Sequence, residues 1–309
     1  MSLANSLKSL GFDIEYIFGI KSIELLIKHF FIFNKKEHKK KFFITWGIYN
    51  FLPLPRKRIL CFMHGFPSFN QQDLLRYYLF RIVIILNKIR RIRTISVSKF
   101  SHSILRDIYK IENNLIRNSL PYEYLESASN NELNKDIDVI FIGRANSFKL
   151  PIFIIGYLEL LAKSGLNILI IGNGNSRDKY LKLNNKTKIK FYDFIDYKNV
   201  LGFLERSKYF ISCSDSEPFG LVFLEALICG CRIISPRSGG ILEISSFFPK
   251  NLSYLFNFYD DEHNAKDIIL GLDFSKKNVS SKSLNDIRKI IEEKFNPISH
   301  AKKVIGYLN

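Results

Sequence analysis

The sequence has few of the residues that cross-link a chain. Four cysteines occur among its 309 residues, all in apolar surroundings: Cys61, Cys213, Cys229 and Cys231. A chain of this length does not need disulfide bonds, and none of the four has the spacing with histidine that a metal site requires. We therefore expect four buried, reduced thiols and no bound metal.

Long hydrophobic runs are also missing. No window of about 18 uninterrupted apolar residues occurs, so we expect no membrane-spanning helix. The first twenty residues lack a basic segment followed by an apolar run, which predicts no secretory leader. These two absences favour a cytoplasmic location.

Acidic residues are scarce relative to basic ones. The sequence holds 46 lysines and arginines against 29 aspartates and glutamates, a net charge of +17. Such an excess favours an acidic partner such as anionic lipid, nucleic acid or a phosphorylated substrate. The densest basic clusters, at residues 35–41 and 90–93, have a solvated surface as their alternative interpretation. They lie away from any recognisable nucleic-acid motif, so we expect no nucleic-acid partner.

Short apolar runs alternate with longer amphipathic stretches, a pattern that predicts an α/β fold with parallel sheets. Strands are predicted at residues 12–18, 42–46, 59–63, 94–97, 115–117, 139–142, 168–171, 189–192, 209–212 and 232–235. Helices are predicted at residues 3–10, 23–33, 73–89, 99–109, 152–163, 198–206, 219–229, 240–245, 265–272, 284–295 and 298–308.

The chain is predicted to form two Rossmann-like domains that face each other across a cleft. Residues 121–136 are polar and without periodicity, which predicts a linker. The first domain would span residues 1–120 and the second residues 137–309. The last helix, at about residues 297–309, would pack back toward the first domain. Such domains bind ligands at the carboxyl ends of their strands.

Two carboxylates stand out after one of these strands. Glu217 and Glu225 bracket a turn and the first two turns of a predicted helix. Pro218 suits the first helical turn, where its missing N–H has no partner to lose. The N–H groups of residues 219–221 and the helix dipole would then form an anion site. Phosphate-binding amides beside hydroxyl-binding carboxylates indicate a sugar nucleotide.

Short sequence motifs follow several of the predicted strands, and together these motifs resemble those of a known family. The motifs are residues 141–144 with Lys149, 170–174, 214–227 and 238–243. In this order they resemble the C-terminal domain of family 4 retaining glycosyltransferases, which have the GT-B fold. The resemblance covers residues 135–309 well and residues 1–120 loosely.

The resemblance implies a role for each charged residue. Glu217 would contact hydroxyls of the donor sugar, and Glu225 would hold the ribose hydroxyls of the nucleotide. Arg144 and Lys149 would bind the leaving diphosphate, because fixed cations stabilise the charge that builds there as the glycosidic bond breaks. The start of the predicted helix would add its amides, at Phe219, Gly220 and Leu221. No metal ion or other cofactor is then expected.

Three weaker signals complete the implied site. His64 ends a predicted strand and precedes a glycine, like the histidine that faces the donor sugar across the cleft in this family. A lone histidine is more often structural, and that alternative stays open. Gly143 and Gly172 would line the donor site at two further strand ends, although a single glycine motif is weak support.

The sequence departs from the family at its beginning. The family opens with a strand and a glycine-rich loop, whereas residues 1–11 already have the pattern of the first helix. The first domain is therefore predicted to be shortened, lacking that strand and loop. A truncated, inactive glycosyltransferase remnant is one alternative that follows.

A basic amphipathic segment indicates an anionic membrane as a partner. Residues 73–93 mix apolar residues with six basic ones, a pattern typical of helices that lie on anionic membranes. An ordinary helix of the first domain is the alternative.

We expect a retaining enzyme that moves a sugar from a nucleotide-diphosphate sugar to a hydroxyl of a lipid-linked polysaccharide or lipopolysaccharide intermediate. It would work at the inner face of the plasma membrane. A GT-B sugar-nucleotide epimerase is the alternative enzyme.

Overall fold

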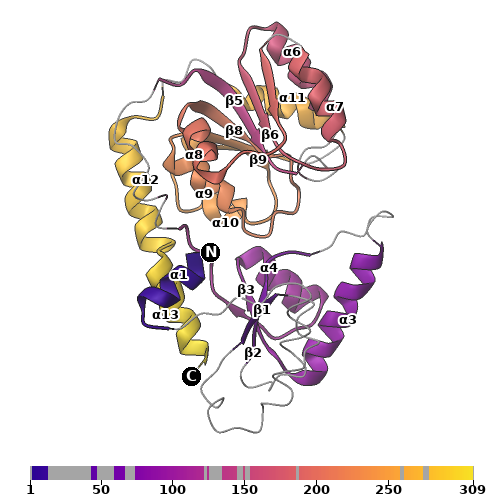
Figure 1. Ribbon diagram of the computed structural model, residues 1–309, viewed down its shortest axis with the longest axis vertical. Helices are drawn as coiled ribbons and strands as arrows, with labels where there is room; N and C mark the ends of the chain where they lie inside the picture. Colours follow the sequence, from indigo (N-terminus) through magenta and orange to yellow (C-terminus); the bar gives the residue numbers. More distant parts are fainter. Residues whose placement is uncertain are drawn as a thin grey trace. The chain divides into compact units, whose positions relative to one another are not determined.

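A computed structural model describes most of the chain as two compact units. Unit 1 is Met1–Ser119 with Pro297–Asn309, and unit 2 is Leu120–Asn296. The described residues are 2–12, 43–46, 59–66, 74–121, 124, 134–144, 149, 154–185, 188–257, 261–273 and 278–308. Each unit is an α/β structure built on a parallel sheet, as predicted (Figure 1).

Unit 1 contains a four-stranded parallel sheet. Its strands, in spatial order, are β1 (Phe43–Trp46), β2 (Ile59–Met63), β3 (Arg93–Ser96) and β4 (Asn114–Leu115). All five side chains of β2 are buried, which a central strand of apolar residues requires. The apolar pattern predicted all four strands.

Helices cover both faces of this sheet (Figure 1). Asn87 of α3 (Leu74–Arg90) contacts the Cys61 sulfur at 3.8 Å. The next strand residue, Phe62, meets His300 of α13 (Pro297–Leu308), with ring centroids 6.2 Å apart. Successive strand residues point to opposite faces, so α3 and α13 lie on opposite sides of β2.

The remaining helices of unit 1 are short. Helix α1 (Ser2–Ser9) packs beside α13. Helix α4 (Lys99–Ser103) starts at a capping box formed by Ser98 and Ser101. A π-helix, η5 (Ile104–Ile108), continues it. The single helix predicted at residues 99–109 is thus two segments of different pitch.

Unit 2 contains a six-stranded parallel sheet. Its strands are β5 (Ile137–Ile142), β6 (Ile168–Ile171), β7 (Ile189–Tyr192), β8 (Ser207–Ile211), β9 (Arg232–Pro236) and β10 (Ser253–Phe256). The spatial order is β10-β9-β8-β5-β6-β7. The chain begins in the middle, runs outward to β7, and returns to the other side of β5. The strand order therefore reverses between β5 and β8, which is the topological switch point of the sheet.

Helices cover both faces of this sheet as well (Figure 1). One face packs on α6 (Ile154–Lys163), α7 (Arg177–Leu181) and α11 (Asp261–Gly271) through a single buried apolar cluster. The other face packs on α9 (Leu221–Ile228), where Phe210 of β8 meets Phe223 at 5.9 Å. The further helices are α8 (Tyr197–Glu205), α10 (Ile241–Ser245), α12 (Ser281–Lys294) and the 3₁₀ turns η6 (Lys182–Asn185) and η7 (Lys250–Leu252).

The sequence pattern did not predict strand β10 or helix α7. Strand β10 lies at the sheet edge and has one buried side chain, so it lacks the continuous apolar run of a central strand. Helix α7 is five residues long and mostly polar, too short to show a helical period. Four predicted features lie outside the described residues, wholly or for the most part: the strand at 12–18, the helix at 23–33, the basic cluster at 35–41 and the linker at 121–136.

A helix that crosses a membrane must be both long and apolar. In the described part of the chain, no helix combines the length and the apolar character needed to cross a bilayer.

Candidate functional site

The carboxyl ends of β5 and β8 meet at the switch point of unit 2. Gly143 and Arg144 directly follow β5, and the loop at residues 212–220 follows β8. The two strands are paired neighbours, with Phe141 opposite Ile211 near these ends. In open α/β sheets, ligands bind in the crevice outside the strand ends at such a point. The fold therefore brings together two of the sequence motifs that lie far apart in the chain.

A second loop holds the backbone of Glu217 in place. The Gly240 N–H donates to the Glu217 carbonyl oxygen at 2.8 Å. A Cβ on Gly239 would lie 2.5 Å from that same oxygen, and a Cβ on Gly240 would lie 2.2 Å from the Phe219 carbonyl oxygen. Neither approach leaves room for a side chain. The two glycines therefore allow one loop to fix the position of the other.

The Glu217 side chain forms an ion pair with Lys149. The Glu217 Oε2 and Lys149 Nζ atoms are 2.8 Å apart, and the side chains are 19% and 43% exposed. Lys149 comes close to the end of β5, because its Cβ lies 3.0 Å from the place a Cβ on Gly143 would take. Arg144 is exposed at the same strand end. A predicted sugar-binding acid and a predicted phosphate-binding cation are thus in direct contact.

The helix after this loop begins later than predicted. Helix α9 starts at Leu221, and Gly220 precedes it with a φ of 82°, a left-handed conformation that glycine adopts without strain. Pro218 therefore lies before the helix, and its predicted place in the first turn is wrong. Phe219 also precedes the helix, and its buried ring packs on Phe295 at 6.0 Å. Its side chain anchors the loop to the core.

Glu225 lies in the second turn of α9 and is half-buried. Burial raises the pKa of its carboxyl group to about 7, and a hydrogen bond from Tyr197 opposes the shift. The Tyr197 ring packs edge-on against Tyr124, with centroids 4.7 Å apart. The sequence analysis missed Tyr197, because a tyrosine at a helix start carries no distinctive signal. The carboxyl group can both donate to and accept from a hydroxyl near neutral pH.

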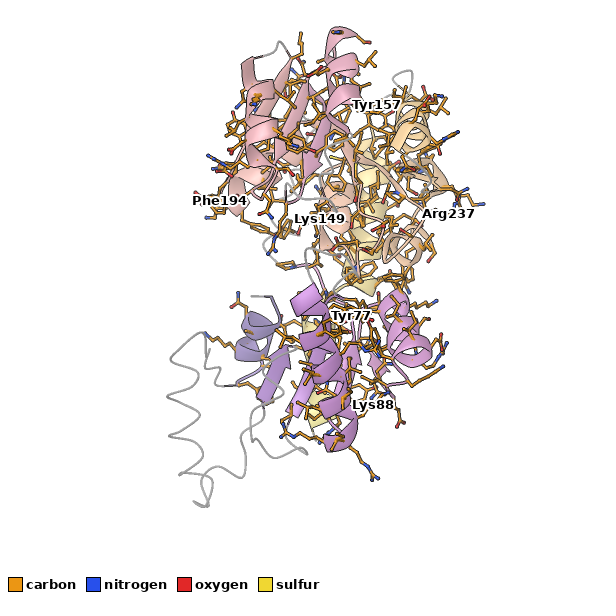
Figure 2. The ribbon with its side chains drawn as sticks, turned by 90° about the vertical axis from the view of Figure 1, so that its right-hand side faces the viewer. Tyr77, Lys88, Lys149, Tyr157, Phe194 and Arg237 are labelled. Carbon is orange, nitrogen blue, oxygen red and sulfur yellow. The ribbon has the colours of Figure 1, made fainter. Side chains whose placement is uncertain are left out.

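The ends of β6 and β7 form the adjoining side of the site. Gly172 is buried, and its N–H donates to the Tyr192 carbonyl oxygen at 2.9 Å. Its role in substrate binding stays a prediction. The Arg177 guanidinium pairs with Asp193, which ties the start of α7 to the loop after β7. Phe194 follows with its side chain 78% exposed (Figure 2). The sequence analysis did not single out Phe194.

His64 belongs to unit 1, where it follows β2. Its ring stacks on Phe62 with centroids 5.7 Å apart. Although the side chain is exposed, desolvation by surrounding protein lowers its pKa to about 4, so the imidazole is neutral at pH 7. His300 is buried nearby, with its Nδ1 2.9 Å from Ser119 Oγ. The predicted role of His64 toward a donor sugar stays a prediction.

Two aspartates at the amino end of β5 are already paired. Asp136 bonds to Arg206, and Asp138 lies 2.7 Å from Lys208. Among the described residues, no group of three or more histidines, cysteines or acids is placed to hold a metal ion. All four cysteines are buried thiols, as predicted.

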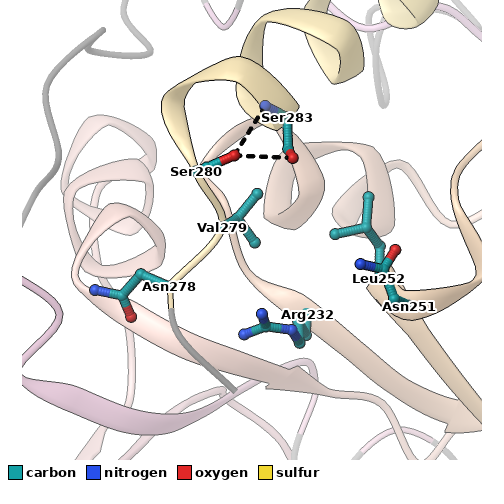
Figure 3. Close-up of a pocket in the computed structure, with 7 residues that line it drawn as sticks. All are labelled: Arg232, Asn251, Leu252, Asn278, Val279, Ser280 and Ser283. Carbon is teal, nitrogen blue, oxygen red and sulfur yellow. Dashed lines mark hydrogen bonds between the residues drawn. The ribbon is translucent and has the colours of Figure 1, made fainter.

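A separate cavity of about 280 Å³ lies at the amino end of β9 (Figure 3). Arg232 and residues near the start of α12 line it. The Ser280 hydroxyl there accepts a hydrogen bond from the Ser283 N–H at 3.3 Å and so caps the helix. Because the cavity lies at the end of the sheet opposite to Glu217, it is not part of the candidate site.

Known proteins share sequence with part of this chain. The model of the family "Glycosyl transferases group 1" matches residues 125–280. Two uncharacterized glycosyltransferases of Methanocaldococcus jannaschii are similar. One is 28% identical over 112 residues, covering 34% of this chain and 28% of the relative. The other is 26% identical over 154 residues, covering 44% and 43%. The match therefore spans less than half of either relative.

Solved structures share the fold over nearly the whole chain. The crystal structure of a glycosyltransferase from Rickettsia africae ESF-5 is 17% identical, with a TM-score of 0.66 and coverage of 99% of this chain and 92% of that one. Anabaena HepE in complex with UDP and glucose is 16% identical, with a TM-score of 0.64 and coverage of 95% and 84%. At these identities the likeness shows the GT-B fold alone.

The matched segment includes every part of the site at the switch point. It runs from before β5 through Arg144, Lys149, Glu217 and Glu225 to the start of α12. It also covers half of the chain. The chain therefore belongs to the glycosyl transferases group 1 and has the GT-B fold.

Proposed function

We propose that this protein is a retaining glycosyltransferase that takes its sugar from a nucleotide-diphosphate donor. The observation that carries the proposal is the Lys149–Glu217 ion pair of 2.8 Å at the end of β5. The pair brings the Lys149 ammonium and the Glu217 carboxylate side by side at the switch point of the sheet, which supports a phosphate site next to a site for sugar hydroxyls. Family membership and the fold support the same reaction class.

The leaving diphosphate would lie between basic side chains and the start of α9. As the glycosidic bond breaks, the bonding electron pair passes to the phosphate oxygen, and negative charge builds there. Arg144 and Lys149 supply fixed positive charge. The amides of Leu221 and Val222 have no acceptor within their own helix and point toward its positive end. These groups would take the place of a metal ion.

Glu217 would orient the sugar. Its side chain is only 19% exposed, so a hydroxyl that displaces water there gains a strong, charge-assisted hydrogen bond. In the retaining reaction we propose, the acceptor oxygen attacks the sugar carbon from the face that the diphosphate leaves. The acceptor proton passes to the departing phosphate oxygen. The step needs no protein nucleophile, and Glu217 serves as a positioning group.

Glu225 would hold the ribose, and a uridine nucleotide is the first donor to test. The half-buried carboxyl group lies in the second turn of α9, beyond the phosphate site at its start. UDP is bound in the structure of Anabaena HepE, which shares the fold. Phe194, exposed after β7, would offer an aromatic face to the base.

The acceptor we propose is a hydroxyl of a lipid-linked surface glycan, at the cytoplasmic face of the membrane. The net charge of +17 supports it, because a lipid-linked acceptor lies among anionic head groups that attract a basic protein.

Nucleotide binding followed by transfer tests the proposal. Titration calorimetry with UDP, GDP and ADP should identify one ligand whose affinity falls about 10- to 100-fold in Lys149→Gln, since a charge-assisted bond is lost. Lys208→Gln is the matched control, because Lys208 forms a comparable ion pair with Asp138 at the other end of β5, with side chains 37% and 12% exposed. Its affinity should stay within twofold of the wild type.

Glu217→Gln separates binding from chemistry. We expect its transfer rate from the identified nucleotide sugar to membrane extract to drop by about 100-fold or more, with nucleotide affinity nearly unchanged. Full transfer by Glu217→Gln, or binding of none of the three nucleotides, would contradict the proposal. Conversion of the sugar nucleotide without an acceptor would indicate an epimerase instead.

A further inference from the structure

Helix α3 has a second apolar face, and the large side chains on it are exposed. Its inner face packs on the sheet through Val83, Ile84 and Asn87, all buried. The side chains on the opposite face are large and exposed: Tyr78 at 58%, Ile82 at 44%, Ile85 at 52% and Ile89 at 71%. We call these four residues the outer stripe.

The outer stripe is a regular feature of the helix. Its members are spaced by four, three and four residues, so at about 100° per residue they fall on one line along the helix. The line runs opposite to the buried residues. A surface helix normally places polar residues there, so a continuous line of isoleucines on this side indicates a second apolar partner.

Positive charge flanks the outer stripe. The helical spacing puts Arg81 and Lys88 along one side, both exposed, and Arg91 follows the end of the helix. Figure 2 shows the Lys88 side chain on this helix. The sequence contains no aspartate or glutamate from residue 74 to residue 106. Arg81 also lies over the Tyr77 ring, 5.8 Å from its centroid. The charged residues of the helix therefore all have the same sign.

We propose that α3 docks on an anionic phospholipid surface with its outer stripe buried among the acyl chains. Helix axis and membrane plane would be parallel, as in interfacial amphipathic helices. The three isoleucines would enter the apolar layer and Tyr78 would sit at the head-group level. Arg81, Lys88 and Arg91 would meet the lipid phosphates. The inference deepens the proposed function and rests on it for the identity of the acceptor.

Charge favours a membrane over a second copy of the chain. Two copies joined through α3 about a twofold axis would bring Arg81 and Lys88 of one helix against the same residues of the other. Like charges placed this way repel, and no acidic residue of the helix offsets them. An anionic lipid surface instead complements every charged residue of the helix.

Vesicle flotation tests the proposal without any sugar donor. The wild type should float with vesicles of phosphatidylglycerol and phosphatidylcholine, and much less with phosphatidylcholine alone. Ile82→Gln, Ile85→Gln and Ile89→Gln combined should lower the partition coefficient more than tenfold while keeping a good helix former at each site. Lys88→Gln with Arg91→Gln should lower it by about fivefold per charge.

The controls use exposed residues of matching type elsewhere. Leu160→Gln with Leu270→Gln removes apolar side chains that are 57% and 70% exposed on α6 and α11. Lys289→Gln with Lys294→Gln removes two exposed cations of α12. Both control pairs should float like the wild type. Circular dichroism and thermal melting show whether each variant keeps its fold.

Three outcomes would overturn the proposal: no flotation of the wild type, equal flotation on neutral and anionic vesicles, or unchanged flotation of the triple isoleucine variant. Light scattering adds a fourth, a dimer that the triple variant abolishes, which would assign the stripe to a second copy. Flotation and nucleotide binding are measured separately. Flotation without transfer would contradict the proposed function alone, and transfer without flotation would contradict this inference alone.

Discussion

Glu225 shows how a single side chain depends on its surroundings. In the sequence it is one carboxylate of a spaced pair, and the resemblance implies a ribose ligand. The structure adds that burial raises the pKa of its carboxyl group from 4.5 to about 7. A glutamate on a solvent-exposed helix would stay ionised at neutral pH. The partner that moderates the shift, Tyr197, comes from α8, and no local pattern links the two.

This pKa predicts how stability depends on pH. Because the pKa is higher in the folded state, folding is favoured most below pH 4.5, and this contribution is lost as the pH rises from 4.5 to about 7. The loss is at most about 3 kcal/mol for a shift of this size, since the group is only half-buried. Urea unfolding of Glu225→Gln should lack this component between pH 4.5 and 7. An identical pH profile in wild type and variant would contradict the raised pKa.

At the scale of the element, the loop after β8 and the start of α9 form one continuous segment of the candidate site. The sequence predicted its parts but placed Pro218 and Phe219 inside the helix. Gly220, with its φ of 82°, turns the chain before the helix begins, so both residues lie outside the helix. Helix boundaries depend on the backbone conformation of single residues, which the spacing of apolar residues in the sequence does not reveal.

The glycine that supports this loop offers a sharp test. A Cβ on Gly240 would lie 2.2 Å from the Phe219 carbonyl oxygen, so Gly240→Ala must push the loop away. We expect a loss of about 2 kcal/mol or more in the free energy of unfolding and a large loss of nucleotide affinity. Thermal melting and titration calorimetry measure the two effects.

Gly156→Ala is the matched control for this change. Gly156 lies inside helix α6, and a Cβ there would meet no atom within 4 Å. Alanine should therefore leave binding intact and stabilise the protein by about 0.5–1 kcal/mol. A Gly240→Ala variant that matched Gly156→Ala in both measurements would show that the close contact between the loops is not required.

At the scale of the whole molecule, each unit has its own apolar core. The core of unit 2 joins its central strands to α6, α7 and α11, and that of unit 1 joins β2 to α3 and η5. Separate cores allow a ligand to stabilise one unit without the other.

Amide hydrogen exchange checks this prediction with the full chain. Saturating UDP should slow exchange in unit 2, at residues 172–174, 193–196 and 219–222, because ligand binding stabilises the folded unit. Exchange in β2 and β3 should stay unchanged, since these strands belong to unit 1, which has its own core. Protection confined to unit 1, or none in either unit, would contradict the assignment of the nucleotide to unit 2.

The sequence by itself determined the fold class, the place of most strands and helices, and the motifs that mark the family. These features are local: apolar periodicity sets each element, and strands β6 and β7 match their predicted ranges residue for residue. Edge strand β10 and short α7 were missed because neither has a full apolar period. Only the tertiary structure decided which strand ends meet, and with them the Lys149–Glu217 contact, the pKa of Glu225 and the exposure of the outer stripe of α3. Strand order, burial and solvent exposure depend on residues far apart in the chain, so no local pattern carries them.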